Sequence, residues 1–371
     1  MLPVAFLAAA AALAAPPPPH RLPLCNVSGG GTGQPNPINF TRCGASGCPE
    51  LPQCSSVTPG GVCIQSCSFP AFPPAERRLM AWVGGDVDNP EDREKLGGMA
   101  AVVQQLQTNP GLFDGLYGFC GWAFKPDGTI YIKNATKYGQ CAGTVNLTST
   151  SIPGGANVLA ECKRQGMDFQ PVIGLDDWQS AEANSAPYIE AFAAAAKQHG
   201  WKGFNLDWEG SNTTSTVPLW RNFCELMNEF ADGLAAHGLA FSTDIQWVTQ
   251  AYGSKPSAEL TALLGAGRAR WITMDTYTVY PQAADALDFY ATRISPEHLS
   301  VGMSCEGPTS PTREGFYGRF EALNLYKITD VTMFMMPTAE TWMPWLRKWK
   351  NNCAGCPNSG SLSCWTDLSC Y

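Results

Sequence analysis

The chain has 371 residues, of which 44% are hydrophobic and 15% charged, so it has ample apolar material for a globular core and is unlike a disordered polypeptide. Its formal net charge is −8 at pH 7 and it has no long run of Lys or Arg, which argues against nucleic acid and anionic membrane as partners. Fifteen cysteines indicate an oxidising compartment.

Residues 1–19 have the features of a cleaved signal peptide. An alanine-dominated apolar run over residues 2–15 precedes four prolines, and no later stretch approaches the roughly 20 apolar residues of a membrane span. No Lys or Arg precedes the run, which leaves an uncleaved anchor as the alternative. We expect a secreted glycoprotein, or delivery to a lysosome or vacuole. Glycosylation acceptors of the form Asn-x-Ser/Thr agree with this route and occur at Asn26, Asn39, Asn134, Asn146 and Asn212.

Two cysteine-rich segments flank the centre of the chain, at residues 20–75 and 353–371. Their Gly, Pro and Ser content predicts disulfide-held extensions that clamp the ends of the main domain, and small carbohydrate-binding modules are the alternative. The chain has only four His, and none lies near the Cys353-x-x-Cys356 pair, so no metal site is expected. The odd number leaves at least one cysteine unpaired within a monomer, and the candidates for a buried thiol are Cys120, Cys162, Cys224 and Cys305.

Residues 76–352 alternate short apolar runs with helical patterns eight times, which predicts the α/β class and a (β/α)8 TIM barrel. An open doubly wound sheet is the alternative, but no Gly-rich dinucleotide turn follows the first strand. The expected strands cover residues 79–83, 115–120, 168–173, 203–207, 239–245, 271–277, 299–303 and 331–335. The expected helices cover residues 92–107, 157–165, 181–199, 217–237, 259–266, 282–294, 313–325 and 341–350.

Barrel active sites lie at the carboxyl ends of the strands, and the chemistry-bearing residues gather there. A period of two places Asn205, Asp207 and Glu209 on one face of the fourth strand. By the same period, Asp275 and Tyr277 share a face of the sixth strand. Carboxylates for proton transfer beside aromatic platforms suit a sugar. The other cleft candidates at this rim are Trp178, Trp208, Gln246, Trp247 and Trp342.

The segment 202–209 resembles the D-x-x-D-x-D-x-E signature of family 18 glycoside hydrolases, the chitinase family, in its last two acidic positions. Residues 119–130, which read FCGWAFKPDGTI, are similar to the family's aromatic second strand and its D-G-x-I hairpin. Thr276-Tyr277 stands where the family has its sixth-strand tyrosine. Asn205 in the second acidic position is closest to the chitobiase-like branch, and Lys202 replaces the first Asp.

The resemblance implies substrate-assisted, retaining hydrolysis of β-linked N-acetylglucosamine in chitin, a chitooligosaccharide or the core of an N-glycan. Glu209 would be the acid and then the base, Asp207 would orient the N-acetyl group, and Tyr277 would donate a hydrogen bond to it. No cofactor is implied, and we expect a monomer; exo or endo action stays open. The substrate-binding residues would be Asn205, Trp208, Asp275, Gln246, Trp247 and Trp342.

Three other functions remain open. A retaining glycosidase with two carboxylates would use Glu209 with Glu306, at the end of the seventh strand, as the nucleophile. A lectin could bind chitin or another glycan on the same barrel without catalysis, although such lectins usually lack the acid and Glu209 is present. A structural or inhibitor protein built on a degenerate barrel would leave the acidic rim unexplained.

Overall fold

The computed structural model describes the barrel strands, most of the helices around them, and parts of the loops. The described residues are 56–57, 63–64, 77–84, 98–125, 127–132, 158–175, 177–207, 217–245, 264, 269–277, 282–291, 293–304, 323, 326, 328–334 and 342–351.

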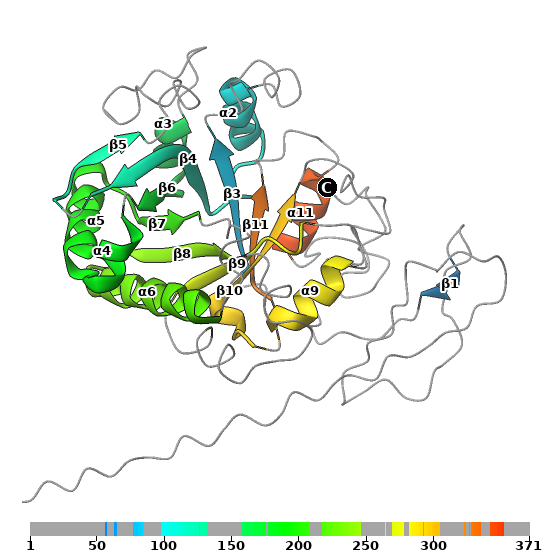
Figure 1. Ribbon diagram of the computed structural model, residues 1–371. Helices are drawn as coiled ribbons and strands as arrows, with labels where there is room; N and C mark the ends of the chain where they lie inside the picture. Colours follow the sequence, from blue (N-terminus) through cyan, green and yellow to red (C-terminus); the bar gives the residue numbers. More distant parts are fainter. Residues whose placement is uncertain are drawn as a thin grey trace, which may run out of the picture.

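Eight parallel strands close into a barrel (Figure 1). The circle closes because β3 pairs in parallel with both β4 and β11. All eight expected strands form, most with ends that differ from the prediction by one to four residues. Their bounds are β3 (Arg78–Gly84), β4 (Gly115–Phe124), β6 (Asp168–Leu175), β7 (Gly203–Leu206), β8 (Ala240–Ile245), β9 (Arg270–Thr273), β10 (Leu299–Ser304) and β11 (Asp330–Phe334). The (β/α)8 prediction is thereby confirmed and the open sheet is wrong.

Helices surround the strands and cover the outside of the barrel (Figure 1). The expected helix over residues 181–199 is two helices, because Asp177 caps a short first one and Pro187 stands in the first turn of a second. The expected helices 259–266 and 313–325 lie almost wholly outside the described residues. The observed bounds are α2 (Gly98–Thr108), α3 (Val158–Gln165), α4 (Trp178–Ala183), α5 (Ala186–His199), α6 (Val217–Ala236), α9 (Gln282–Ala291), α11 (Met343–Lys350) and the 3-10 helix η5 (Pro296–His298).

The expected hairpin after the second barrel strand is present. Strand β5 (Ile130–Ile132) runs antiparallel to the end of β4. The turn between them holds Gly128 at φ 85°, a conformation that glycine adopts without steric cost, and the Thr129 N–H donates to Asp127 Oδ1 at 2.8 Å. The D-G-T-I sequence therefore forms the turn that its residues favour.

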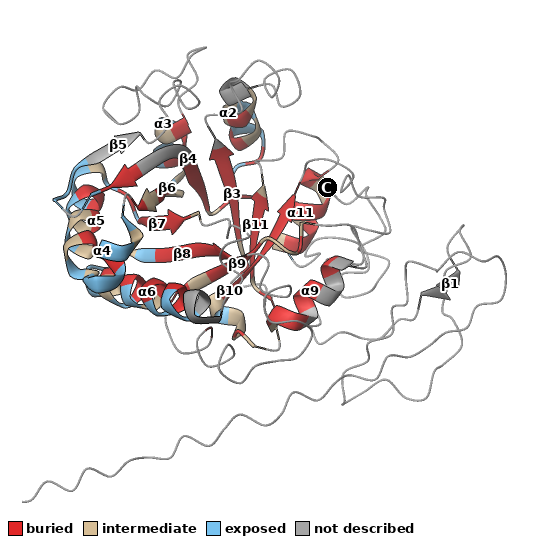
Figure 2. Cartoon of the chain, in the orientation of Figure 1, coloured by how far each residue is buried: buried red, intermediate tan, exposed pale blue. Residues whose placement is uncertain are grey.

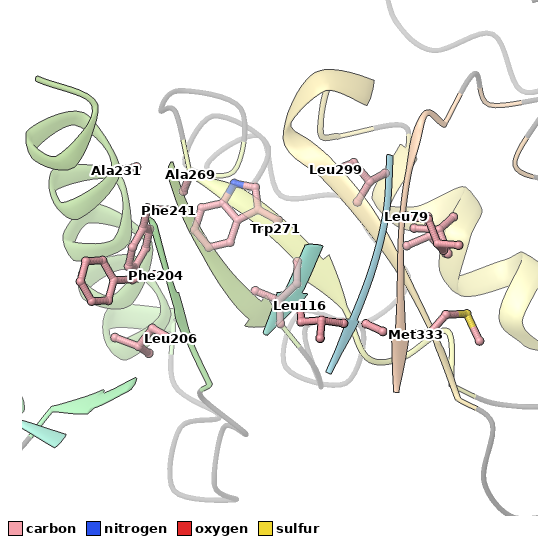
Figure 3. Close-up of a cluster of buried hydrophobic side chains, with 14 of the residues drawn as sticks. Leu79, Leu116, Phe204, Leu206, Ala231, Phe241, Ala269, Trp271, Leu299 and Met333 are labelled. Atoms are coloured by element: carbon pink, nitrogen blue, oxygen red, sulfur yellow. The ribbon is translucent and has the colours of Figure 1, made fainter. Parts of the chain in front are cut away.

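The core has two layers, one inside the barrel and one between the strands and helices (Figure 2). Strand β7 shows the division, because Phe204 and Leu206 are fully buried in the outer layer while Asn205 faces inward. Figure 3 shows Phe204 and Phe241 gathered beside Ala231 of α6. Burying one such large apolar side chain contributes about 1.5–3 kcal/mol. Among the described residues, the inner layer includes the buried side chains of Met80, Trp82, Tyr117, Val172 and Ile272, with Tyr277 and Phe334 packed against them.

Charged side chains close the amino-terminal end of the barrel interior. Arg78 and Arg270 both donate to the same oxygen of Asp330, at 3.1 and 2.5 Å. Asp330 is 1% exposed, so its charge is compensated out of contact with water. The amino-terminal end is thus held by ion pairs, and the carboxyl end is the one that remains for a ligand.

The last helix, α11, is fastened to the start of the barrel. Lys350 Nζ donates to the Asp114 carboxylate, and also to the Arg77 carbonyl at 2.6 Å. The Arg77 guanidinium lies 5.3 Å from the centre of the Trp349 ring, and Trp349 is fully buried. These contacts join residues more than 230 positions apart and keep the two ends of the barrel domain together.

The flanking segments lie almost entirely outside the described residues. Of residues 1–75 only β1 (Ser56–Val57) and β2 (Cys63–Ile64) are described, as a short antiparallel pair. The signal peptide, the disulfide-rich extensions and the tail 353–371 therefore stay predictions. Cys162 and Cys224 are buried free thiols, which confirms two of the four candidates.

Two features are absent from the described residues. None of the described helices has the length and apolar character to cross a bilayer. Within the same part of the chain, no three His, Cys, Asp or Glu side chains come together as possible metal ligands.

Candidate functional site

Polar residues of β7 lie at the carboxyl end of the barrel interior. Asn205 is fully buried and points into the barrel, and Asp207 follows the strand directly and is half-buried. Glycine at position 203 lets β7 lie close to β8, since a Cβ there would be 2.3 Å from the Ala240 carbonyl oxygen. The face that the sequence assigned to Asn205 and Asp207 is thus directed to the interior.

The Asn205 amide is held from two sides. Trp82 Nε1 of β3 donates to Asn205 Oδ1 at 3.5 Å, and Asn205 Nδ2 donates to Ser242 Oγ of β8 at 3.1 Å. An indole N–H can only donate, so it identifies which amide atom is the oxygen. Asn205 therefore has one orientation, immediately below the strand end that carries Asp207.

Tyr117 lies inside the barrel, between Ser242 and the ion pairs of Asp330 at the amino-terminal end. Its hydroxyl faces Ser242 and Arg78 without a hydrogen bond of normal geometry to either. Burial raises the pKa of Tyr117 above its ordinary value, and the positive charge of Arg78 opposes that rise. The phenol is therefore neutral at physiological pH.

Tyr277, in the turn after β9, packs against the inner layer of the barrel. Its ring stacks on Phe334 of β11 with 5.7 Å between the ring centres and an angle of 16°. It meets the Trp82 ring edge-on, at 6.3 Å and 81°. The tyrosine and Asn205 consequently contact the same Trp82 indole, so two of the sequence-predicted site residues are brought together.

The predicted shared face of Asp275 and Tyr277 is wrong. Strand β9 ends at Thr273, and a turn follows in which the Tyr277 N–H donates to the Met274 carbonyl at 2.9 Å. Asp275 instead accepts a hydrogen bond from the Tyr290 hydroxyl of α9 at 2.5 Å. Burial, and after it the Asp275 charge, hold the pKa of Tyr290 well above its ordinary value. Asp275 thus contacts the helical layer, while Tyr277 packs inside the barrel.

Asp244 of β8 also belongs to this region, and the sequence places it at the same rim, at the end of the fifth strand. Leu206 and Thr243 are paired across β7 and β8, so Asp207 and Asp244 occupy the next matched positions. Asp244 is 1% exposed and shares the inward face of Ser242. The sequence analysis missed Trp82, Tyr117 and Ser242, because nothing local marks them.

The remaining predicted site residues divide into two groups. Trp342 is 3% exposed and lies in the outer core cluster, beside residues of α11. Trp178, at the start of α4, is half-buried against the outer cluster, with its ring centre 6.1 Å from that of Phe223. The others fall outside the described residues, namely Trp208, Glu209, Gln246, Trp247 and Glu306.

Solved structures show the same fold at low sequence identity. A chitinase from Chromobacterium violaceum aligns with a TM-score of 0.52 at 9% identity, over 74% of this chain and 98% of that one. The spore cortex-lytic enzyme SleL of Bacillus megaterium gives 0.51 at 12%, over 80% and 78%. A class V chitinase from Pseudomonas fluorescens gives 0.51 at 12%, over 74% and 99%. No family model and no curated protein sequence matches the chain. At these identities the resemblance is one of fold alone.

Proposed function

We propose that this chain is a glycoside hydrolase that cleaves β-linked N-acetylglucosamine by substrate-assisted, retaining catalysis. One observation carries the proposal: Asp207 follows a rigidly held Asn205 at the carboxyl end of β7, and Tyr277 packs on the Trp82 that binds this asparagine. Its barrel is also that of two chitinases and a spore cortex-lytic enzyme. Chitin, chitooligosaccharides and N-glycan cores all offer the required bond.

The proposed mechanism divides the work between three side chains. Glu209 protonates the oxygen of the leaving sugar and then takes a proton from water. Asp207 orients the N-acetyl group, whose carbonyl oxygen attacks the anomeric carbon, and it stabilises the positive charge of the cyclised intermediate. Tyr277 donates a hydrogen bond to the same group. Asn205 cannot ionise, so its role is structural: it fixes the end of β7 that carries Asp207.

The proposed substrate contacts come from the loops that follow the strands. Trp208 and Trp247 would stack on sugar faces, and Gln246 would bind hydroxyl groups. Asp275 is bonded to Tyr290 and Trp342 is buried in the outer core, which favours a supporting role for both. We further propose that the protein is a monomeric glycoprotein, either secreted or delivered to a lysosome or vacuole. Its partner is a polysaccharide or an oligosaccharide.

The test is hydrolysis of chromogenic N,N′-diacetylchitobiose and chitotriose glycosides by the purified glycoprotein, at several pH values from about 4 to 7. Glu209→Gln should abolish turnover and keep sugar binding, because the amide retains the shape but carries no transferable proton. Asp207→Asn should lower kcat by orders of magnitude. Glu306→Gln is the matched control and should leave the rate near that of the wild type.

Each alternative predicts a different outcome. A large loss with Glu306→Gln and a small one with Asp207→Asn would identify a two-carboxylate glycosidase. Binding of chitotriose without turnover by the wild-type protein would identify a lectin. A thiazoline that mimics the cyclised intermediate should inhibit competitively, since such a species binds more tightly than substrate. An active enzyme that ignores the thiazoline would contradict participation of the acetamido group.

A further inference from the structure

A closed ring of hydrogen bonds, here called the threonine ring, joins the turn after β9 to β10. The Gly302 N–H donates to Thr273 Oγ1 at 3.3 Å, the Thr273 and Thr276 hydroxyl oxygens lie 2.8 Å apart, and Thr276 Oγ1 donates to the Gly302 carbonyl at 2.6 Å. Each hydroxyl has one proton, and Thr276 Oγ1 can donate it to the Gly302 carbonyl or to the Thr273 carbonyl, which lies 2.9 Å away. The ring is complete when Thr273 donates to Thr276 and Thr276 donates to the nearer Gly302 carbonyl. Because every bond runs in the same sense around the ring, each one polarises the next.

The threonine ring lies where regular strand pairing ends. The last paired residues of β9 and β10 are Thr273 and Val301. Beyond them the chain turns away from β10, and side-chain hydroxyls bind the backbone groups of Gly302 in place of a neighbouring strand. Both threonines are at most 3% exposed, so water does not compete for these groups. The ring therefore fixes the start of the turn that presents Tyr277.

Gly302 is also the wall on which the Tyr277 ring rests. A Cβ at this position would lie 2.4 Å from Tyr277 Cε1 and 2.1 Å from the Thr273 carbonyl oxygen, so any larger residue would force both to move. The stacked Phe334 and the edge of Trp82 confine the tyrosine ring on other sides. The backbone of the tyrosine is held by Thr276, and its ring by Gly302 and two aromatic rings.

We propose that Thr276 is a positioning residue for Tyr277, acting through the threonine ring to set where the tyrosine hydroxyl lies. This inference rests on the proposed function, in which that hydroxyl donates a hydrogen bond to the acetamido group of the substrate. Thr276 has no contact of its own with the sugar. Its effect on the rate is carried by Tyr277 alone, because a displacement of about 1 Å in a group that orients the substrate can cost on the order of 100-fold in rate.

The test compares two substitutions of Thr276 in the full-length protein. Thr276→Val keeps the shape and removes the hydroxyl, so the ring opens at two bonds. It should lower kcat for the chitotriose glycoside roughly 10- to 100-fold. Thr276→Ser keeps the hydroxyl and should stay within about threefold of the wild type. Rescue by serine excludes a role for the methyl group, and measuring kcat well below the thermal midpoints of both variants excludes a general loss of stability.

A double-mutant cycle with Tyr277→Phe separates positioning from other structural effects. If Thr276 acts only through the tyrosine hydroxyl, Thr276→Val should cause no further loss of kcat in a Tyr277→Phe background. Multiplicative losses would overturn the inference, and so would an unchanged kcat in Thr276→Val alone. Both outcomes presuppose an active enzyme.

A second measurement does not depend on activity. The Tyr277, Trp82 and Phe334 rings lie within about 6.5 Å of one another and couple in near-ultraviolet circular dichroism. Thr276→Val should change this spectrum, and Thr276→Ser should not. A protein without hydrolase activity that shows this pattern would refute the proposed function and leave the placement of Tyr277 by Thr276 standing. An unchanged spectrum would refute the placement itself.

Discussion

Replacing Asn205 by leucine is expected to destabilise the barrel although the two side chains have the same number of heavy atoms and the same branching. The amide is fully buried and accepts from Trp82 Nε1 at 3.5 Å while it donates to Ser242 Oγ at 3.1 Å. Leucine can make neither bond. Trp82 and Ser242 are 4% and 2% exposed, so no solvent replaces the lost partner.

The magnitude follows from the two groups that lose a partner. A buried polar group left without a hydrogen bond costs about 1–3 kcal/mol. The hydrogen bond from Trp82 is long, so we expect its loss to cost an energy near the lower limit of this range. The Ser242 hydroxyl can rotate toward another acceptor, which reduces its cost as well. The apolar leucine recovers part of the cost. We therefore expect Asn205→Leu to lower the free energy of unfolding by about 1–3 kcal/mol.

Urea denaturation followed by tryptophan fluorescence measures this change. The midpoint should fall while the dependence on urea concentration stays the same. Ser242→Ala serves as the second arm of a cycle, and the double variant should lose less than the two single variants together. Equal stability of Asn205→Leu and wild type would show that the bonds of Asn205 to Trp82 and Ser242 contribute nothing. Additive losses would show that Asn205 and Ser242 do not stabilise each other.

Three further outcomes are expected. Asp177 caps α4 and its hydrogen bonds to Ser180 lower its pKa, so Asp177→Ala should lower the thermal midpoint near neutral pH. The difference should vanish as the pH falls through the folded-state pKa of the aspartate, because the capping carboxylate is then protonated in both states. Burial raises the pKa values of Cys162 and Cys224 to about 12, from 9.0 for a free thiol, so alkylation at pH 8 should be about a thousandfold slower in the folded protein than after unfolding, as read by mass spectrometry. Neither amide atom of Gln170 has a partner within the described part of the chain, so Gln170→Leu should raise the unfolding midpoint, and a lower midpoint would show that ordered water satisfies the amide.

Local patterns were sufficient for the barrel and for half of the candidate site. The eight apolar runs predicted eight strands because a strand buried on both faces needs apolar residues throughout. The period of two placed Asn205 and Asp207 on one inward face, because side-chain alternation is a property of the backbone and needs no distant partner. The D-G-T-I turn is equally local, since Gly128 supplies a positive φ within the hairpin.

The alternation of side chains gave the wrong prediction for Asp275 and Tyr277, because it holds only within a strand and β9 ends at Thr273. Where β9 ends depends on Gly302, which lies about 30 residues later and binds the hydroxyls of Thr273 and Thr276. Similarly, Trp82 and Ser242 hold Asn205 across 123 and 37 residues of chain. The residue types that carry the chemistry can be read from the pattern of the chain. Their supports come from strands that meet only when the barrel closes, because closure brings residues distant in sequence within hydrogen-bonding distance.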